Sequence, residues 1–306
     1  MIGGIVEVAE AGRHLSIYRG FLKVAADGET LGQVPLDDIT ALILSGPQIT
    51  LSKHVMVALA ERRAVVIVCG QNWHPLSFTL PFGVHFEAAG VLRDQINAGE
   101  PLKKRLWQRL VWAKIGNQAV ILAKHAPKHD KLSELAVLQR RVKSGDPENM
   151  EAQAARHYWP ALMAAGFRRE RAALDANSYL NYGYTVLRAA TARAVCGAGL
   201  NPALGLHHGS RVNAFALVDD LMEPFRPLVD TIARDFAEVD DGQMAVLDPD
   251  KKRRLAAVLQ QDLIAEAGTS PLINCLGRLA QSLAASLAAK KDLLDLAQFV
   301  PSGRLL

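Results

Sequence analysis

The chain has 306 residues, of which 50% are hydrophobic and 22% are charged. This composition excludes a disordered chain and provides enough apolar residues for a sizeable core. No apolar run approaches the roughly 18 residues of a membrane span, and residues 1–7 lack the basic-then-apolar pattern of a secretory signal. The cysteines Cys69, Cys196 and Cys275 lie far apart, which excludes a local zinc knuckle and disfavours a disulfide framework. We expect a cytoplasmic protein.

The net charge of +4 is unevenly distributed along the chain. Residues 87–171 hold 16 Lys and Arg against 9 Asp and Glu, whereas 1–86 hold 6 against 7 and 172–306 hold 13 against 15. A basic cluster is most often a solvated helix face, but several clusters in one segment favour a polyanion such as DNA. The candidate DNA-binding residues are Lys103, Lys104, Arg140, Arg141, Lys143, Arg156, Arg168 and Arg169. Arg156 is equally compatible with a structural salt bridge.

The first 85 or so residues predict a small β domain. A buried strand is expected at 41–44, a helix with Ser52 as its N-cap at 53–61, and a central β-branched strand at 64–69. Residues 71–83 contain two prolines and a glycine and predict a linker or a hairpin. Short, partly alternating runs separated by turns indicate a meander at the start of the chain, with strands at 5–8, 14–18 and 21–24.

From about residue 86 the apolar residues recur at helical spacing. Asp146 is expected to be an N-cap, with Pro147 at the first helical position. The predicted fold class is α+β, with an N-terminal β-sheet domain at 1–85 and a larger all-α domain at 86–306. The helical patterns cover 102–122, 132–142, 147–166, 175–196, 212–237, 250–267 and 270–298.

Candidate catalytic residues in the helical half are acids and histidines, since the sequence holds no P-loop, Gly-x-Ser-x-Gly elbow or His-Glu-x-x-His pair. Glu151 lies near a helix start, and the alanines three and four residues later leave room for a metal or a substrate. Alternatively, Glu151 merely interacts with the positive end of the helix. The glycine-flanked pair His207-His208 is a candidate metal ligand, with a surface histidine as the alternative.

Asp220 and Glu223 are three residues apart and share a helix face. Their apolar neighbours indicate partial burial, and two such carboxylates repel each other unless a cation lies between them. A divalent cation supplies that compensation. Pro224 predicts a kink or a fresh helix start beside the acids. An exposed acidic turn is the alternative interpretation.

Three segments, in this order, resemble a known family: residues 151–159, 205–208 and 220–227, with sequences EAQAARHYW, GLHH and DLMEPFRP. Together with LWQRLVWAKIGNQ at 106–118 and VPLDDI at 34–39, they are similar to the CRISPR-associated spacer-acquisition integrases and endonucleases, and to the type II branch in particular. Each motif alone has low specificity, whereas the ordered set is specific and spans nearly the whole chain.

The resemblance implies a divalent-metal-dependent DNA integrase and endonuclease of CRISPR adaptation. It joins the 3′-hydroxyl of a spacer precursor to the CRISPR repeat by transesterification. The family's metal-binding and catalytic Glu, His and acid match Glu151, His208 and Glu223, with Asp220 as an assisting ligand and His207 as a competing one. Ala152 stands where many relatives carry glycine. The implied metal is Mg²⁺ or Mn²⁺, because a mixed set of oxygen and imidazole ligands suits these ions better than calcium.

The resemblance also implies partners. The family binds double-stranded DNA and forms homodimers through the N-terminal β domain. Two dimers clasp a central dimer of a small ferredoxin-like second adaptation protein, and type II systems add an effector nuclease and a ring-shaped accessory protein. Two other functions remain open from the residues themselves. One is a stand-alone metal nuclease acting on branched or single-stranded DNA, and the other is a non-catalytic DNA-binding scaffold.

Overall fold

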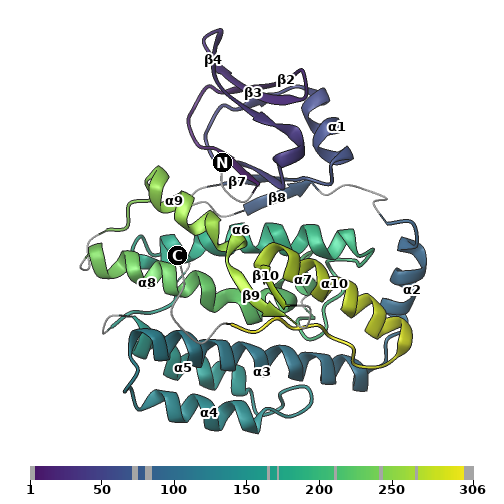
Figure 1. Ribbon diagram of the computed structural model, residues 1–306, viewed down its shortest axis with the longest axis vertical. Coiled ribbons are helices and arrows are strands. Elements are labelled where there is room, and N and C mark those ends of the chain that lie inside the picture. Colours follow the sequence, from purple (N-terminus) through teal and green to yellow (C-terminus); the bar gives the residue numbers. More distant parts are fainter. Residues whose placement is uncertain are drawn as a thin grey trace.

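The computed structural model describes residues 4–70, 75–79, 85–163, 166–170, 172–209, 212–240, 244–265 and 268–299. It consists of a smaller β-rich part and a larger helical part, which lie one above the other in Figure 1. The predicted α+β fold class is therefore confirmed. Within the described residues, no helix is both long enough and apolar enough to cross a membrane.

The β-rich part contains two four-stranded sheets, with strand orders β1-β5-β7-β8 and β4-β3-β2-β6. Helix α1 (Lys53–Glu61) follows Ser52, which occupies the N-cap position as predicted but makes no capping hydrogen bond through its side chain. The strands are β1 (Ile5–Val8), β2 (His14–Tyr18), β3 (Phe21–Ala26), β4 (Glu29–Pro35), β5 (Ala41–Leu44), β6 (Thr50–Leu51), β7 (Val65–Cys69) and β8 (Pro75–Thr79).

The predicted meander is correct for β2 and β3, which pair antiparallel and continue into β4, but it is wrong for β1. Strand β1 pairs in parallel with β5, so that Ile5 faces Ala41, and β5 pairs in parallel with β7. Turn residues in a sequence indicate only where the chain reverses direction locally. Two parallel strands are joined instead by a long crossover connection, which turn residues do not reveal. Strand β8 lies within the predicted linker or hairpin at 71–83, of which residues 71–74 and 80–83 lie outside the described residues.

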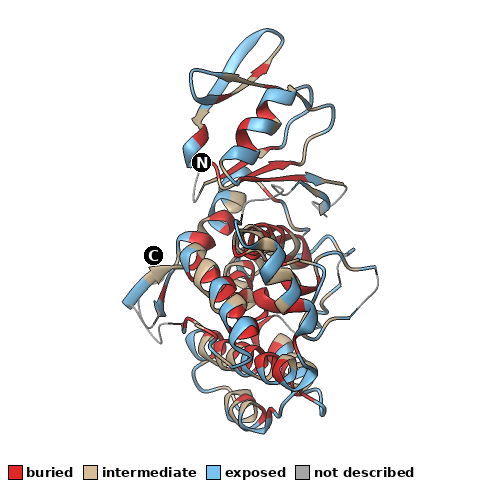
Figure 2. Cartoon of the chain, turned by 90° about the vertical axis from the view of Figure 1, so that its right-hand side faces the viewer, coloured by how far each residue is buried: buried red, intermediate tan, exposed pale blue. Residues whose placement is uncertain are grey.

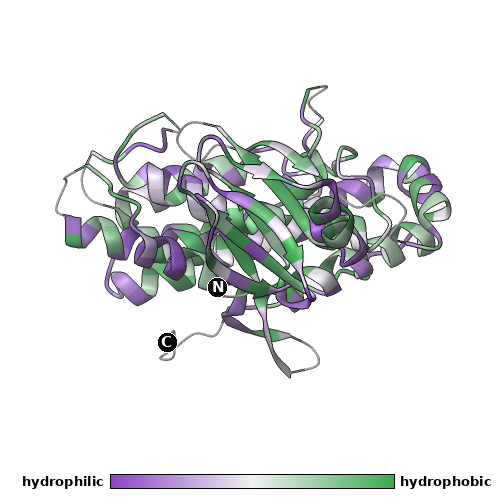
Figure 3. Cartoon of the chain, turned by 90° about the horizontal axis from the view of Figure 1, so that it is seen from above, coloured by the Kyte–Doolittle hydropathy of each residue, from purple (hydrophilic) through white to green (hydrophobic). Residues whose placement is uncertain are grey.

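Strands β1, β5 and β7 of the β1-β5-β7-β8 sheet are largely buried on both faces because they lie between two hydrophobic cores (Figure 2). Ile5, Ile43 and Ile67 face the helical part, while Val6 and Leu42 face the other sheet and α1. Successive side chains of a strand point to opposite faces, so burial on both faces requires apolar residues at every position. The runs ALIL and VVIVC satisfy this requirement, and Figure 3 shows these strands as a hydrophobic band.

Helix α3 is the longest described helix, and it packs against α4, α5, the 3₁₀ turn η3 and α8. Its apolar stripe includes Leu106, Leu110 and Leu122, all fully buried. The helices are α2 (Ala88–Asn97), α3 (Glu100–His125), α4 (Lys131–Arg141), α5 (Met150–Leu162), α6 (Ala176–Gly197), α7 (Ala216–Met222), α8 (Arg226–Asp240), α9 (Pro249–Ala256) and α10 (Leu272–Ala289), and η3 is Glu223–Phe225.

Three helix predictions are corrected by the structure. The helix expected from Pro147 starts at Met150, with Asn149 as its N-cap. The patterns at 250–267 and 270–298 are too long, because strands β9 (Asp262–Ala265) and β10 (Gly268–Pro271) form an antiparallel hairpin between α9 and α10. The larger domain is therefore mostly helical rather than all-α. Over only four residues, the pattern of apolar residues does not distinguish a β-strand from the end of a helix, so the two short strands were read as helix.

Candidate functional site

Glu151 is held in the first turn of α5 by two capping residues. The Asp146 carboxylate accepts hydrogen bonds from the backbone N–H groups of Met150 and Glu151, at 2.8 and 3.0 Å. The Asn149 side chain accepts a third, at 3.2 Å from the N–H of Ala152. Asp146 therefore does cap this helix, although from outside the N-cap position. With its first turn fixed, α5 holds the Glu151 side chain toward α3.

Glu223 lies where the chain breaks between α7 and α8. The predicted kink at Pro224 is confirmed, since Glu223–Phe225 forms the 3₁₀ turn η3 between the two helices. The side chain of Asn117, buried in α3, donates a hydrogen bond of 2.7 Å to the carbonyl of Pro224. This bond anchors the turn to α3 and brings the Glu223 carboxylate to the same helix that Glu151 faces.

The ammonium of Lys114 lies between the two glutamates. Lys114 Nζ is 2.6 Å from Glu151 Oε1 and 2.5 Å from Glu223 Oε2. The lysine is 8% exposed and Glu223 is 6% exposed, so this contact is shielded from water. Two carboxylates that are 72 residues apart in the sequence therefore share one cation. Sequence reasoning did not select Lys114, although a lysine on the apolar stripe of α3, four residues after Leu110, was a usable signal.

Glu223 is also paired with Arg226, whose Nε lies 2.8 Å from Glu223 Oε1. Burial raises the pKa of Glu223, but the charges of Arg226 and Lys114 outweigh burial and lower that pKa below its ordinary value. Burial lowers the pKa of Lys114, yet Glu223 and Glu151 raise it above the ordinary value overall. The Glu223 carboxylate and the Lys114 ammonium are therefore both held in their charged forms.

His208 is oriented by Asp220. The imidazole Nδ1 hydrogen-bonds to Asp220 Oδ1, while Asp220 Oδ2 accepts hydrogen bonds from the backbone N–H groups of Leu206 and His207, at 2.7 and 3.1 Å. The hydrogen bond to Asp220 is the main reason that the pKa of His208 is raised, and the charges of Glu223 and Glu151 add to the effect. With Nδ1 engaged, Nε2 is the nitrogen that remains for a metal.

The loop before His208 requires glycine at position 205. A Cβ on Gly205 would lie 2.6 Å from the carbonyl oxygen of His208 and 3.0 Å from Asp220 Oδ2. Only a residue without a side chain lets the backbone close this tightly around the Asp220 carboxylate. The ring of His207 stacks on Trp107, with centroids 4.4 Å apart and an interplanar angle of 1°. His208, rather than His207, therefore carries the carboxylate-oriented imidazole.

The donor set suits a divalent cation. Among the described residues, no three His, Cys, Asp or Glu side chains form a group that could hold a metal ion as they stand, and Lys114 lies between Glu151 and Glu223. The residues nonetheless fit such an ion, since two carboxylates already converge on one cation and His208 beside them is fixed by a carboxylate. Both oxygens of Asp220 are engaged elsewhere, so in this arrangement Asp220 positions His208.

The predicted DNA-binding residues differ in the partners that engage them. Lys103 pairs with Glu100, and Arg141 and Lys143 both pair with Glu148. Arg169 donates hydrogen bonds to the side chains of Asn177 and Asn181, which ties it into the fold. Lys104, Arg140, Arg156 and Arg168 are exposed. Among the described residues, Arg156 forms no ion pair, and it lines a hollow of about 330 Å³ along α5. All eight residues remain predictions as DNA contacts.

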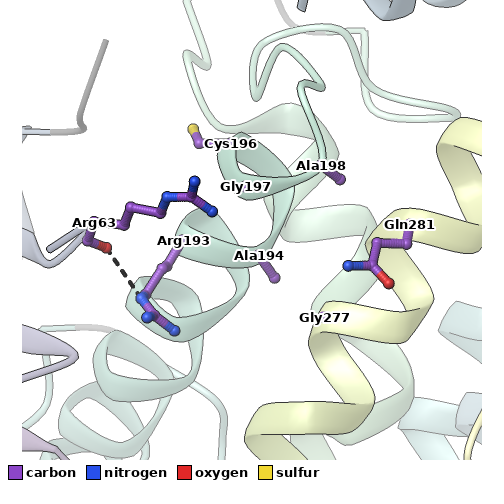
Figure 4. A pocket seen from close by; sticks show the side chains of 8 residues that line it. All are labelled: Arg63, Arg193, Ala194, Cys196, Gly197, Ala198, Gly277 and Gln281. Atoms are coloured by element: carbon purple, nitrogen blue, oxygen red, sulfur yellow. Dashed lines mark hydrogen bonds between the residues drawn. The ribbon is translucent and has the colours of Figure 1, made fainter. Parts of the chain in front are cut away.

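A second basic hollow, which sequence reasoning missed, lies between α6, α10 and the loop after α1 (Figure 4). Its volume is about 170 Å³, and it is lined by Arg63 and Arg193 on one side and Gln281 on the other. Arg193 Nε donates a 3.0 Å hydrogen bond to the carbonyl of Arg63. Burial, followed by the charge of Arg63, lowers the pKa of Arg193. Among the described residues, neither arginine is paired with an acid.

Comparisons with known proteins identify the family. The model of the family described as CRISPR associated protein Cas1 matches residues 6–263. The CRISPR-associated endonuclease Cas1 of Neisseria meningitidis is 36% identical over 281 residues, covering 91% of this chain and 90% of that protein. A second such endonuclease, from Pyrobaculum aerophilum, is 29% identical over 296 residues, covering 92% of this chain and 98% of that protein.

Solved structures share the fold. A casposase bound to integration product superimposes with a TM-score of 0.78 at 20% identity, covering 95% of this chain and 92% of that one. A CAS1 protein from Thermotoga maritima gives a TM-score of 0.74 at 14% identity, covering 95% and 98%. On the match to the family model and the identity to the Neisseria protein, the chain belongs to the CRISPR-associated Cas1 family.

Proposed function

We propose that this chain is the integrase and endonuclease of CRISPR adaptation, which joins the 3′-hydroxyl of a spacer precursor to the CRISPR repeat. The observation that carries the proposal is the convergence of Glu151 and Glu223 on one cation position beside a carboxylate-oriented His208. Membership of a family whose relatives are named CRISPR-associated endonucleases supports it. A divalent cation is the ligand that this donor set recognises, with Mg²⁺ or Mn²⁺ as the metals proposed.

When bound, the metal supplies electrophilic stabilisation of charge on the phosphoryl oxygens. Glu151 and Glu223 would contribute oxygen ligands, and His208 would contribute Nε2 because Asp220 holds Nδ1. The protein supplies no nucleophile. The DNA 3′-hydroxyl attacks the phosphorus, a new phosphodiester bond forms, and the bond to the repeat's own 3′-oxygen breaks. If water replaces the hydroxyl, the same site cuts DNA.

Further parts of the proposal concern organisation and partners. The domains proposed are a dimerising β domain at 1–85 and a catalytic domain at 86–306. The proposed partners are double-stranded DNA and the second adaptation protein, and the latter is supported by a structural relative described as a Cas6-RT-Cas1–Cas2 complex. The exposed residues Lys104, Arg140, Arg156 and Arg168 and the hollow lined by Arg63 and Arg193 offer positive charge for phosphates.

A strand-transfer assay tests this function. The purified protein is mixed with the second adaptation protein, a short duplex and a repeat-bearing plasmid, in Mn²⁺ or chelator. We expect joining that needs both the metal and a 3′-hydroxyl on the duplex. Glu151→Ala and His208→Ala should each lower joining by at least about 100-fold, because each removes a proposed metal ligand. DNA binding, measured by mobility shift, should persist.

Three outcomes separate the alternatives. Joining at the wild-type rate by either variant rejects the assigned site. Metal-dependent cutting without joining, even with the partner present, replaces the integrase by a stand-alone nuclease. The absence of any metal-dependent change favours a DNA-binding scaffold. Glu148→Ala is the matched control, because Glu148 lies just before α5 and contacts exposed Arg141 and Lys143 rather than Lys114.

A further inference from the structure

The position of the Lys114 ammonium is where a metal bound by both glutamates would lie. Its nitrogen contacts Glu151 Oε1 at 2.6 Å and Glu223 Oε2 at 2.5 Å. Mg²⁺ binds oxygen ligands at roughly 2.0–2.1 Å. The metal ion and the Lys114 ammonium would contact the same two oxygens. They therefore cannot occupy this space at the same time.

Charge balance leads to the same conclusion. Without a metal, the charges of Glu151 and Glu223 are offset by Lys114 and by Arg226, which holds the other oxygen of Glu223. Adding a divalent cation while Lys114 stays would leave this shielded cluster with an excess of two positive charges. Like charges at such short range are strongly unfavourable in a buried environment.

We propose that Lys114 is a built-in counter-ion that competes with the divalent metal, so that metal loading requires the ammonium to leave the two carboxylates. This inference rests on the proposed metal site. Lys114 stabilises the metal-free protein and weakens metal binding. Its release on loading turns a neutral cluster into one with a net positive charge, which is the charge that favours a phosphate group of DNA.

Wild-type protein alone provides the first test. Lysine acetylation is followed by mass spectrometry in chelator and in saturating Mg²⁺. Lys114 should be protected in chelator and should react at least about 5-fold faster with Mg²⁺, because its amine is displaced toward solvent. Lys124, which is exposed on the same helix, is the internal control and should react equally in both conditions. Equal protection of Lys114 in both conditions overturns the inference.

Variants provide the second test. Lys114→Met removes the charge and keeps an unbranched side chain that is one atom shorter, and Lys124→Met is the matched control. In chelator, Lys114→Met should lower the melting temperature, since two carboxylates then face each other without their shared cation. Calorimetric titration with Mn²⁺ should show at least about 10-fold tighter binding to Lys114→Met than to wild type, and Mn²⁺ should restore the melting temperature.

The results distinguish this inference from the proposed function. If wild type and Lys114→Met bind Mn²⁺ equally, or if the variant binds it more weakly, the competition is overturned while the metal site stands. If neither protein binds Mn²⁺, the metal site itself is rejected and the inference falls with it. Should Lys114→Met fail to fold even with Mn²⁺, the acetylation rates of wild type decide.

Discussion

A buried acid next to the site shows how single residues tune this molecule. Asp230 of α8 is 2% exposed and accepts a hydrogen bond from the hydroxyl of Tyr184. Burial raises the pKa of Asp230 to about 7, although Tyr184, Tyr158 and Arg226 act in the opposite direction. In the unfolded chain an aspartate titrates near its ordinary value of 3.8. The folded state therefore binds a proton that the unfolded state has already released.

This difference predicts a pH-dependent stability. Because the folded-state pKa is raised, the contribution of Asp230 is fully present below about pH 4 and is lost as pH rises to about 7. Three pKa units correspond to roughly 4 kcal/mol as an upper bound. The Asp230→Asn variant has no carboxyl group at this position, so its stability should not show this decrease with rising pH. The free energy of unfolding of wild type relative to Asp230→Asn, from urea titrations, should fall between about pH 4 and about pH 7.

The exposed control Asp250→Asn, which removes a surface pair with Arg253, should keep a nearly constant difference from wild type. If the gap between wild type and Asp230→Asn is the same at every pH, Asp230 is not protonated in the folded state.

At the scale of elements, the close packing of α6 against α8 depends on one glycine. A Cβ on Gly183 would lie 2.4 Å from Val229 Cγ1 and 3.2 Å from Leu255 Cδ2. Both helices lie next to the candidate site, since α8 starts directly after η3 and α6 contains Tyr184. A glycine inside a helix costs about 1 kcal/mol relative to alanine. Here it is required because the neighbouring side chain occupies the space.

Gly183→Ala should therefore destabilise the protein, by about 1–3 kcal/mol from overpacking, despite its better helix propensity. Adding Val229→Ala should recover part of the loss, so the double variant should be more stable than the sum of the two single effects predicts. Urea denaturation measures all of these values. Gly197→Ala in the same helix has no atom within 4 Å of the added Cβ and should be neutral or slightly stabilising. If the effects of Gly183→Ala and Val229→Ala on the free energy of unfolding are additive, the helices α6 and α8 move apart freely to accommodate the added methyl group.

At the scale of the whole molecule, Glu7 links the β-rich part to the helices. Its Oε2 accepts a 2.8 Å hydrogen bond from the hydroxyl of Tyr182 in α6, and its Oε1 lies 2.8 Å from Lys252 Nζ in α9. Ser45 donates to the same carboxylate from the β-rich part. Together with the hydrogen bond from Arg193 to the carbonyl of Arg63, the linkage adds directional contacts to the apolar face of the β1-β5-β7-β8 sheet.

Glu7→Leu should weaken this linkage, because it leaves Lys252 without the carboxylate. Both side chains of this pair are 12% exposed, so the loss should be smaller than the roughly 3–5 kcal/mol of a fully buried pair. We expect the unfolding transition seen by calorimetry to broaden or split, with faster hydrogen exchange in β1 and β5. Lys252→Met added to Glu7→Leu should recover part of the stability. One sharp transition at an unchanged temperature would show that apolar packing alone couples the two parts.

The sequence predicted most elements but not how they meet. The period of apolar residues located α3, α4, α6 and most of β1 to β7, because periodicity is a local property. The parallel pairing of β1 with β5 is set by contacts across more than 30 residues and left no local signal. The hairpin β9-β10 was missed because its short strands resemble helix ends.

The candidate site divides in the same way. Glu151, His208 and Glu223 were selected from motifs. The structure brings Glu151 and Glu223 to one lysine and places His208 within range of their charges, while their role as ligands stays a prediction. Lys114 was not selected, because a lysine in a helix is normally exposed and its burial depends on two distant carboxylates. The role of Asp220 beside His208 likewise follows from the loop at Gly205, which no spacing rule reveals.

The arrangement around α3 also has a consequence during synthesis. Lys114 and Glu151 leave the ribosome well before Glu223, and until the η3 turn docks through Asn117 the ammonium has one carboxylate partner instead of two. A chain that terminates before Glu223 lacks that carboxylate, the Arg226 pair and the packing of α8 on α3. Prematurely terminated products should therefore lack the cation position that Glu151 and Glu223 share.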